Sequence, residues 1–378
     1  MTEEVRVYED VSGLTGLGAG TLAALRAAGL DAEDVARAVR MALDEDFAYG
    51  PDVTSAATVA GRTVTADVVA REAGVLAGGP VALAVLDLIG GYVEGPAAGA
   101  GARGWRDARR AAAGARGASG TVLAAAGRLG VSGTVLVADG ERIGAGDAVL
   151  RLSGSAPAVL GAERTMLNFL THLSGIATAT RAWADAIEGT GAAVRDTRKT
   201  TPGLRVLDKY AVRCGGGRNH RMGLGDAALI KDNHIAAAGG VAAAIEAVRS
   251  AAAGWEWAGT KPAGAESAGA RMAPSGAARP GGAGGLVVEV ECDSVGQVRE
   301  ALDAGAHFLL LDNMSVGSLR EAVAVARDYY GVRLEASGGL RLENAREVAE
   351  TGVDYLAVGA LTHSSRALDL GLDFADEG

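Results

Sequence analysis

The chain has 378 residues and a formal net charge of −10 at pH 7, and 49% of its residues are hydrophobic. This length allows one large domain or two ordinary ones with a sizeable core, and we expect two. The acidic balance argues against general nucleic-acid binding, which needs a basic surface. The apolar stretches are much shorter than the roughly 20 residues that cross a bilayer, and the acidic N-terminus, MTEEVRVYED, does not read as a secretory signal. We therefore expect a cytoplasmic protein with no membrane or nucleic-acid partner.

Cysteine usage argues against two further kinds of stabilisation. The two cysteines, Cys214 and Cys292, have no second ligand at metal-binding spacing. The sequence therefore supports neither a disulfide framework nor a zinc site, and we expect two buried or half-buried thiols.

Residues 1–155 have the pattern of a first α/β domain. We expect a helix at 22–46, strands and turns from residue 64, and strands again at 135–154. The segment 95–133 consists almost entirely of Ala, Gly and Arg, a composition that buries little apolar surface. We interpret it as an insertion without a chemical role in a small open sheet flanked by helices.

Helical periodicity follows at 156–189, in two pieces that we divide near Ser174 and Gly175. Arg164 lies on the same side of the first piece as Leu160 and Leu167. On this pattern alone, such an arginine is more often a rim or salt-bridge residue than a ligand-binding one.

From residue 192 onward, short apolar strands alternate with helices. The expected strand ends at 291, 312, 336 and 359 are 21, 24 and 23 residues apart, which is the spacing of one βα unit per step. Helices are expected to begin after Ser294 and Ser315 and to stop at Gly305, Gly331 and Gly352. An Ala/Gly/Pro-rich segment at 250–285 reads as a second insertion. Residues 156–378 thus form an α/β barrel or a doubly wound sheet, and the sequence leaves open whether the last residues return to the first domain.

One basic segment, 195–235, stands out in this acidic chain. It contains nine Lys and Arg residues, and Pro202, Gly203 and the glycines at 215–217 interrupt it. Such interruptions mark loops rather than a solvated helix face. Because Arg matches planar carboxylates and phosphates and Lys supplies a point charge, the segment predicts an anion site. A plain basic surface loop is the alternative.

The ends of the expected strands carry most of the chemically active side chains. In α/β barrels the loops at the C-terminal ends of the strands converge on one mouth. Gly-rich turns there suit phosphate groups, and two carboxylates on neighbouring strands suit Mg²⁺ that is shared with substrate phosphates. The residues at these ends are Asp196, Arg198, Lys199, Lys231, Glu291, Asp312, Ser337, Gly338, Gly339, Gly359 and, shortly after, His363. The pattern predicts a phosphorylated, metal-chelating substrate beside an organic acid.

Each of these residues has a simpler interpretation as well. Lys231 at a strand end is compatible with a Schiff-base lysine, as in barrel aldolases. Glu291 and Asp312 are also suited to stabilising helix N-termini. His220, next to Arg221, is as compatible with a structural role as with a functional one.

Seven motifs resemble those of the quinolinate phosphoribosyltransferase family. They are DTRKTTPGLR (196–205), GGGRNHRMGLGD (215–226), IKDNHI (230–235), EVE (289–291), LLLDN (309–313), SGGL (337–340) and GVDYLAVGALTHS (352–364). The resemblance implies an N-terminal open α/β sandwich, a C-terminal open α/β barrel and a homodimer or larger assembly. It also implies phosphoribosyl transfer from phosphoribosyl pyrophosphate to quinolinate with Mg²⁺, yielding nicotinate mononucleotide, pyrophosphate and CO₂ in NAD biosynthesis.

The resemblance also implies a role for individual residues. Those that match quinolinate ligands are Arg164, Arg198, His220, Arg221 and Lys231, with Arg164 reaching into the partner subunit's site. Lys199, Glu291 and Asp312 match catalytic residues around the sugar donor, and the two carboxylates match its metal site, directly or indirectly. The remaining donor-binding positions are Thr197, Ser337, Gly338, Gly339, Gly359, Ala360 and His363.

Three competing functions stay open on the sequence. One is a relative of the same fold that is associated with molybdenum transport. The others are a Schiff-base barrel aldolase that uses Lys231 and a non-catalytic phosphate-binding barrel. The combination of Arg198, Arg221 and Lys231 with two carboxylates favours quinolinate.

Overall fold

The computed structural model describes residues 15–93, 130–254 and 286–375. The chain divides into a first unit, 1–178 with 366–378, and a second unit, 179–365. The sequence pattern predicts a division at 155, and the difference is the first part of helix α7 (Ala156–Ala186), which belongs to the first unit. The last residues return to the first unit, because β12 (Leu370–Phe374) pairs with β1 (Thr63–Ala70). Most of the two expected insertions lies outside the described residues.

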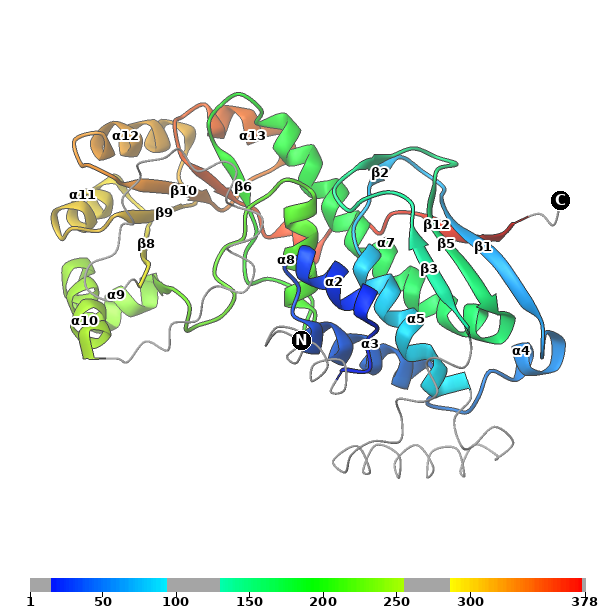
Figure 1. Ribbon diagram of the computed structural model, residues 1–378. Coiled ribbons are helices and arrows are strands. Elements are labelled where there is room, and N and C mark those ends of the chain that lie inside the picture. The colour runs from blue at the N-terminus through cyan, green and yellow to red at the C-terminus, as the bar shows by residue number, and fades with distance from the viewer. Residues whose placement is uncertain (1–14, 94–129, 255–285, 376–378) are drawn as a thin grey trace, which may run out of the picture. The chain divides into compact units, whose positions relative to one another are not determined.

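The first unit is an antiparallel sheet covered by helices. Its four strands run in the order β12-β1-β5-β3, and a separate small pair joins β2 to β4. Figure 1 shows α2, α3, α5 and α7 on one side of this sheet, which is the arrangement of an open sandwich. The further elements are α2 (Ala19–Ala27), α3 (Ala32–Asp46), α4 (Val53–Thr58), β2 (Gly74–Val75), α5 (Gly79–Val93), β3 (Ser132–Val135), β4 (Arg142–Ile143) and β5 (Ala148–Ser155).

The expected helix at 22–46 is two helices, α2 and α3. Gly29 has a φ of +64° between them, a left-handed conformation that ends the first helix. Asp31 then caps the second, because its carboxylate accepts from the backbone N–H groups of Glu33 and Asp34, each at 3.0 Å. The apolar periodicity of the sequence continues across this break, so the pattern predicted one helix instead of two.

The expected break in the next helix was wrong, because α7 is continuous through Ser174 and Gly175. Both residues serve close packing instead. The Ser174 hydroxyl accepts from the N–H of Ala77 at 3.0 Å and donates to its carbonyl at 3.2 Å. A Cβ on Gly175 would lie 2.2 Å from the carbonyl oxygen of Arg366, so only glycine lets that segment approach the helix.

The second unit is an open barrel of six parallel strands. Their order is β6-β11-β10-β9-β8-β7, and each strand is hydrogen-bonded to the next one in this order. Within the described residues, β6 and β7 are the two edge strands and are not paired with each other. Helices α10 to α13 lie outside the strands (Figure 1). The elements are β6 (Ala193–Arg195), α8 (Arg205–Cys214), β7 (Ala228–Ile230), α9 (Asp232–Ala238), α10 (Val241–Gly254), β8 (Val288–Cys292), α11 (Val295–Asp303), β9 (Phe308–Asp312), α12 (Val316–Ala326), β10 (Arg333–Ser337), α13 (Leu342–Ala349), β11 (Tyr355–Ala357) and α14 (Ala360–His363).

Local signals set the helix starts of this unit well. Ser294 and Ser315 are the N-caps of α11 and α12, each accepting a backbone N–H with its hydroxyl. The helix ends were less well placed. Helix α12 ends at Ala326 rather than near Gly331, and α10 continues to Gly254, into the segment expected as an insertion.

The interior of the barrel carries charged side chains beside aliphatic ones such as Leu310. Successive strand residues point to opposite faces, so Glu289 and Glu291 of β8 share a face that Val290 does not. Glu335 of β10 and Arg195 of β6 meet on this same inner side in an ion pair. Ordinary barrel interiors are filled by branched aliphatic side chains, so this composition is itself a functional signal.

Among the helices of the described residues, none is on its own long and apolar enough to cross a membrane. Helices α9 and α10, which form a bent pair, reach the length and apolar composition of a membrane span only when the two are counted together.

Candidate active site

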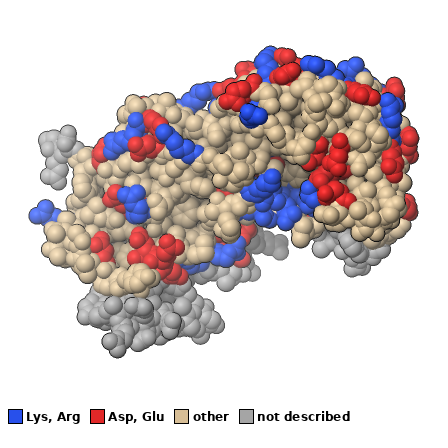
Figure 2. Space-filling model, turned by 180° about the vertical axis from the view of Figure 1, so that it is seen from behind, with Lys and Arg blue, Asp and Glu red and all other residues tan. Residues whose placement is uncertain are grey.

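A cavity of about 700 Å³ opens at the C-terminal ends of the barrel strands. The sequence-predicted residues that line it are Thr197, Arg198, Lys199, His220, Arg221, Lys231, Glu291, Asp312, Ser337, Gly338, Gly339, Gly359, Ala360 and His363. Figure 2 shows Lys and Arg side chains gathered on one face directly beside Asp and Glu side chains. The expected convergence of distant segments on one mouth is therefore present.

Asp196, which the sequence also places at a strand end of the mouth, is buried and does not line the cavity. Of the residues that the resemblance assigns to the site, Arg164 lies elsewhere. It is in the part of α7 that belongs to the first unit, and its side chain is exposed. Among the described residues, none makes an ion pair or side-chain hydrogen bond with it. Its guanidinium is available to a group outside its own chain.

Two arginines form the cationic side of the cavity. Arg221 donates to the carbonyl of Ala227 at 3.0 Å, which fixes the direction of its side chain. The Nε atoms of both Arg221 and Arg198 are buried, and no described residue accepts from them. Because a buried donor without a partner is costly, these two groups are suited to an acceptor supplied by a ligand. Burial, and next to it the charge of Arg198, lowers the pKa of Arg221.

Lys231 links the cationic side to the carboxylates. It follows β7 directly, and its Nζ forms an ion pair with the carboxylate of Glu291 at the end of β8. Asp312 ends β9 and accepts a hydrogen bond from Asn313 Nδ2 at 2.7 Å. Both carboxylates line the cavity, so they are in place to face a cation or a phosphorylated ligand.

The turn after β10 is shaped by glycine. Gly338 and Gly339 have φ values of +80° and +63°, which side chains rarely adopt. A Cβ on Gly338 would lie 2.1 Å from Asn313 Oδ1, whereas one on Gly339 would meet nothing within 4 Å. The turn therefore lines the cavity with two residues that have no side chain, an arrangement that suits a phosphate group.

Lys199 is held against the last turn of the site. The Thr362 hydroxyl donates to the Lys199 carbonyl at 2.8 Å, and the Lys199 N–H donates to Thr197 Oγ1 at 3.0 Å. A Cβ on Gly359 would lie 3.1 Å from Lys199 Cδ. The small residue at 359 thus leaves room for the lysine stem, which carries its charge into the cavity.

A buried network beneath the cavity supports the loop that carries His220 and Arg221. Lys209 on α8 forms an ion pair with Asp196, and both side chains are 0% exposed. Asp196 also accepts from the His220 N–H at 2.8 Å and from Asn219 Nδ2 at 2.6 Å, while Lys209 donates to the His220 carbonyl at 2.9 Å. Sequence reasoning missed Lys209, whose position on an amphipathic helix gives no sign of burial.

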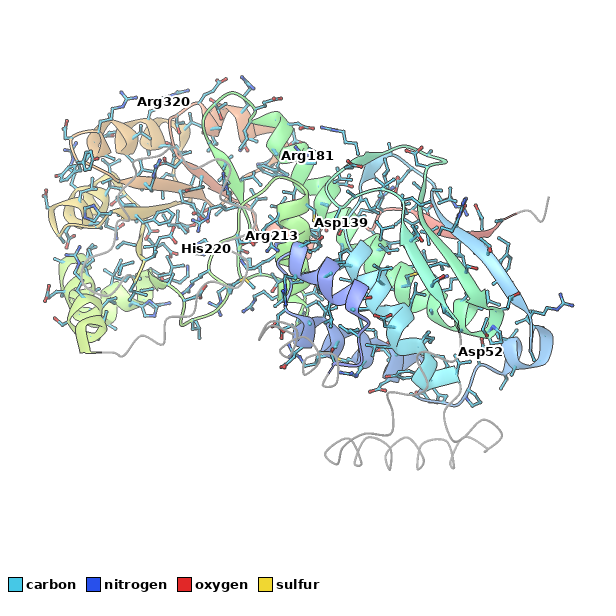
Figure 3. The ribbon with its side chains drawn as sticks, viewed as in Figure 1. Asp52, Asp139, Arg181, Arg213, His220 and Arg320 are labelled. Carbon is cyan, nitrogen blue, oxygen red and sulfur yellow. The ribbon has the colours of Figure 1, made fainter. Side chains whose placement is uncertain are left out.

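A second buried cluster was also missed, and it contains His220, Glu289 and Glu335. His220 lies among the strands of the barrel (Figure 3). Its Nε2 is 2.9 Å from Glu289 Oε2 and 3.8 Å from Glu335 Oε1, and its Nδ1 accepts from the Arg221 N–H at 2.7 Å. Both ring nitrogens are therefore engaged within the protein. The signal that would have found the acids is their alternation with aliphatic residues in VEVE and RLEAS.

Comparison with known proteins decides the family. The model of the quinolinate phosphoribosyl transferase C-terminal domain matches residues 176–256 and 280–373, and the model of the N-terminal domain matches 108–174. The chain belongs to this family. The family that the sequence motifs indicated is thus confirmed. The fold that the resemblance implied is confirmed as well.

Curated members of the quinolinate phosphoribosyl transferase family match over long stretches. A carboxylating nicotinate-nucleotide pyrophosphorylase of Mycobacterium leprae is 46% identical over 344 residues, which cover 90% of this chain and 97% of that protein. A probable enzyme of the same name from Bacillus subtilis is 39% identical over 235 residues, covering 62% of this chain and 70% of that protein.

Solved structures agree on the fold. The nicotinate-nucleotide pyrophosphorylase of Francisella tularensis has a TM-score of 0.68 and 31% identity, covering 91% of this chain and 96% of its own. NadC of Streptococcus pyogenes has a TM-score of 0.69 and 32% identity, covering 92% of this chain and 99% of its own.

Proposed function

We propose that this enzyme transfers the phosphoribosyl group of phosphoribosyl pyrophosphate to the ring nitrogen of quinolinate. Pyrophosphate and CO₂ leave, and nicotinate mononucleotide is the product, as a step of NAD biosynthesis. The observation that carries the proposal is the single cavity in which cationic side chains meet two carboxylates and two Gly-rich turns. Membership of the quinolinate phosphoribosyl transferase family supports it.

Arg198, Arg221 and Lys231 are the proposed ligands of the quinolinate carboxylates. Quinolinate is a dianion and the sugar donor carries further negative charge, so bringing them together is repulsive. Two unit charges 4 Å apart interact by about 1 kcal/mol in water and about 4 kcal/mol at an effective dielectric constant of 20. Several cations in one partly buried cavity offset this repulsion, and the Nε atoms of Arg198 and Arg221 have no hydrogen-bond partner among the described residues.

We assign His220 a different part of the acceptor site. The resemblance made it a carboxylate ligand, but both of its nitrogens already have partners in the protein. Its contact with the Arg221 N–H makes it a positioning residue for that arginine. Its ring then bounds the cavity as an uncharged surface.

The donor side consists of Lys199, the carboxylates of Glu291 and Asp312, and the turns at 337–339 and 359–360. Glu291 and Asp312 are oxygen ligands on neighbouring strands, which fits Mg²⁺ that is shared with substrate phosphates. When bound, Mg²⁺ would supply charge neutralisation for the departing pyrophosphate. Thr197 and His363 line the same side and are proposed to contact the donor.

The chain's own contribution to the reaction is positioning and electrostatics. Lys199 and the backbone N–H groups of the turns hold the donor so that its anomeric carbon faces the pyridine nitrogen. Attack by this nitrogen makes the ring a cation, and loss of the adjacent carboxylate then leaves a carbanion that the ring charge stabilises. No covalent bond between enzyme and substrate is required.

The aldolase alternative is less well supported by the geometry. A Schiff-base lysine reacts as a free amine, whereas Lys231 is engaged as a cation by Glu291. Borohydride trapping of a carbonyl substrate on Lys231 would be evidence for the aldolase function. The relative associated with molybdenum transport is distinguished only by the acceptor that the enzyme uses.

We further propose that the enzyme works in the cytoplasm as a homodimer or larger assembly, with Arg164 completing the partner's acceptor site. The exposed and unpaired state of Arg164 among the described residues supports this assignment. Subunit exchange between Arg164 and Arg198 variants tests the assembly.

The function is tested by incubating the purified enzyme with quinolinate, phosphoribosyl pyrophosphate and Mg²⁺ while following CO₂ release. We expect CO₂ and nicotinate mononucleotide in equal amounts, and no product with nicotinate as the acceptor. A Lys199→Ala variant serves as the matched control for background. Absence of CO₂, or equal use of nicotinate, would overturn the proposal.

A further inference from the structure

Arg205 is the first residue of helix α8, and its side chain is half-buried. Cations are stabilising in the last turn of a helix and unfavourable in the first, where the helix dipole is positive. The helix itself therefore gives no reason for an arginine at this position. The reason lies in the contacts of its side chain with two loops of the cavity, 196–201 and 220–227.

The guanidinium of Arg205 joins these two loops through all three of its nitrogens. In the first loop, its Nε donates to the Thr200 hydroxyl at 3.0 Å, and its Nη2 donates to the Arg198 carbonyl over a longer distance of 3.4 Å. In the second loop, its Nη1 donates to the Met222 carbonyl at 2.9 Å. One planar group thus links the loop that carries Arg198 to the loop that carries Arg221.

The turn at 222–226, which follows Arg221 directly, has few other ties to the barrel. The Asp226 carboxylate closes it by accepting from its first two backbone N–H groups at 2.6 and 2.8 Å. Among the described residues, Arg205 makes the one hydrogen bond that joins this turn to another segment. The position of Arg221 relative to the neighbouring loop therefore depends on Arg205.

Lys199, on the same loop as Arg198, is held in another way. Its N–H donates to one threonine hydroxyl, and its carbonyl accepts from another. The Nε atoms of Arg198 and Arg221, by contrast, are buried and have no partner among the described residues. Loss of the Arg205 contacts should therefore displace the two arginines more than the lysine of the donor side.

We propose that Arg205 is a positioning residue for the acceptor. By joining the two loops, it holds the guanidinium groups of Arg198 and Arg221 in one fixed relative position, as two adjacent carboxylates on one ring require. The inference rests on the proposed function, because it takes quinolinate as the acceptor. The planar fork of arginine is needed for contacts in three fixed directions, and lysine carries the same charge without this geometry. The geometry of Arg205, more than its charge, thus serves the acceptor site.

The first measurement needs no substrate. Backbone hydrogen–deuterium exchange of the ligand-free protein should be faster in Arg205→Lys than in wild type for both loops, 196–201 and 220–227. Arg249→Lys is the matched control, because Arg249 also donates to two backbone carbonyls, at 2.7 and 2.5 Å, but from α10 to the residues after α11. It should leave both loops unchanged. Exchange in Arg205→Lys that equals wild type in the two loops would overturn the inference, whether or not the enzyme uses quinolinate.

The second measurement is the affinity for each substrate alone, by calorimetric titration. Arg205→Lys should weaken quinolinate binding by about 10-fold to 100-fold, as for ligand groups displaced by about 1 Å, and leave sugar-donor binding within about threefold. An arginine that served the fold alone would lower stability without separating the two substrates. Equal losses for both substrates, or unchanged quinolinate affinity, would refute the assignment. A wild-type enzyme that does not bind quinolinate would instead refute the proposed function, and the exchange measurement would still decide whether Arg205 joins the loops.

A double-mutant cycle with Arg221 tests the route of the effect. Arg205→Lys should cost at least about threefold less quinolinate affinity in an Arg221→Ala background than in wild type, because the arginine that it positions is already absent. Equal costs in the two backgrounds would show that Arg205 does not act through Arg221, and would overturn the inference.

Thr200 provides a second pair of variants in case Arg205→Lys does not fold. Thr200→Val removes the hydroxyl that accepts from Arg205 Nε, whereas Thr200→Ser keeps it. We expect the valine variant to weaken quinolinate binding by about 3-fold to 10-fold and the serine variant to stay within about twofold of wild type. Equal quinolinate affinities of the two variants would contradict the positioning role.

Discussion

Lys209 and Asp196 form an ion pair from which solvent is completely excluded. The pair lies between helix α8 and the end of β6, and through the backbone of His220 it fixes the loop that presents Arg221 to the cavity. Charge in this barrel therefore has two functions. One set of side chains faces the ligand, and a second set, out of contact with it, holds the first in position.

Replacing Lys209 by Met should destabilise the protein strongly. Removing one partner leaves Asp196 as an uncompensated buried charge, which typically costs about 3–5 kcal/mol. Urea unfolding followed by circular dichroism measures the loss. Arg37→Met, which breaks the exposed pair of Arg37 with Asp34, is the matched control and should stay within about 1 kcal/mol of wild type. A loss for Lys209→Met no larger than this control would show that the buried pair is not needed for the fold.

The two glycines after β10 should respond differently to alanine. Both pay the cost of a left-handed alanine, roughly 1–2 kcal/mol. Gly338→Ala must in addition displace Asn313, whereas the space beside Gly339 is open. We expect Gly338→Ala to lose sugar-donor affinity severely and Gly339→Ala to lose little, as measured by calorimetric titration with the donor. Equal losses would mean that the turn conformation, and not the contact with Asn313, governs donor binding.

Stability should depend on pH through Glu289. Its pKa is raised from the usual 4.5 to about 7 in the folded chain, so the folded state binds more protons than the unfolded state between these values. The stabilisation that this provides is complete below about pH 4.5 and is lost as the pH rises through 7. At about 1.4 kcal/mol per pH unit, Glu289→Gln should gain about 3 kcal/mol relative to wild type over that interval. Unfolding free energies of both proteins at several pH values test this, and a constant difference would contradict it.

The acceptor ligands should separate in their effects on the two substrates. Arg221→Ala should weaken quinolinate binding by about 10-fold to 100-fold, since a charge-assisted hydrogen bond contributes about 1.5–3 kcal/mol, and should leave donor binding near wild type. Lys231→Ala should weaken both, because Glu291 on the donor side loses its partner. Separate affinities for the two substrates measure this. Equal losses for Arg221→Ala would contradict its assignment to quinolinate.

Site residues at strand ends could be predicted from the sequence, and those within strands could not. Lys231, Glu291, Asp312 and Gly338 stand at or next to strand ends, and parallel strands bring their ends to one edge whatever the details of packing. Glu335 lies within a strand, between Leu334 and Ala336, so it is recognised as an inward-facing acid only when the alternation is followed residue by residue.

The support beneath the site was harder to predict for a different reason. Lys209 and Asp196 meet through the packing of a helix on a loop, which no local pattern encodes. The same limit explains the error at Gly175, where a glycine that permits close approach of another segment looked like a helix break. The periodicity of a sequence indicates which face of a helix or strand is apolar. Which segment packs against that face depends on the tertiary structure.

Arg164 offers a decisive test of assembly. If it completes the partner's site, then Arg164→Ala and Arg198→Ala should each be nearly inactive alone, yet regain activity when their subunits are mixed. In a mixed dimer, the subunit with Arg198 intact receives Arg164 from its partner, while the other site lacks both arginines. Half of the dimers are mixed after random exchange and each has one complete site, so about a quarter of wild-type activity should return. If Arg164 served the site of its own chain, every site in the mixture would lack one arginine and no activity would return.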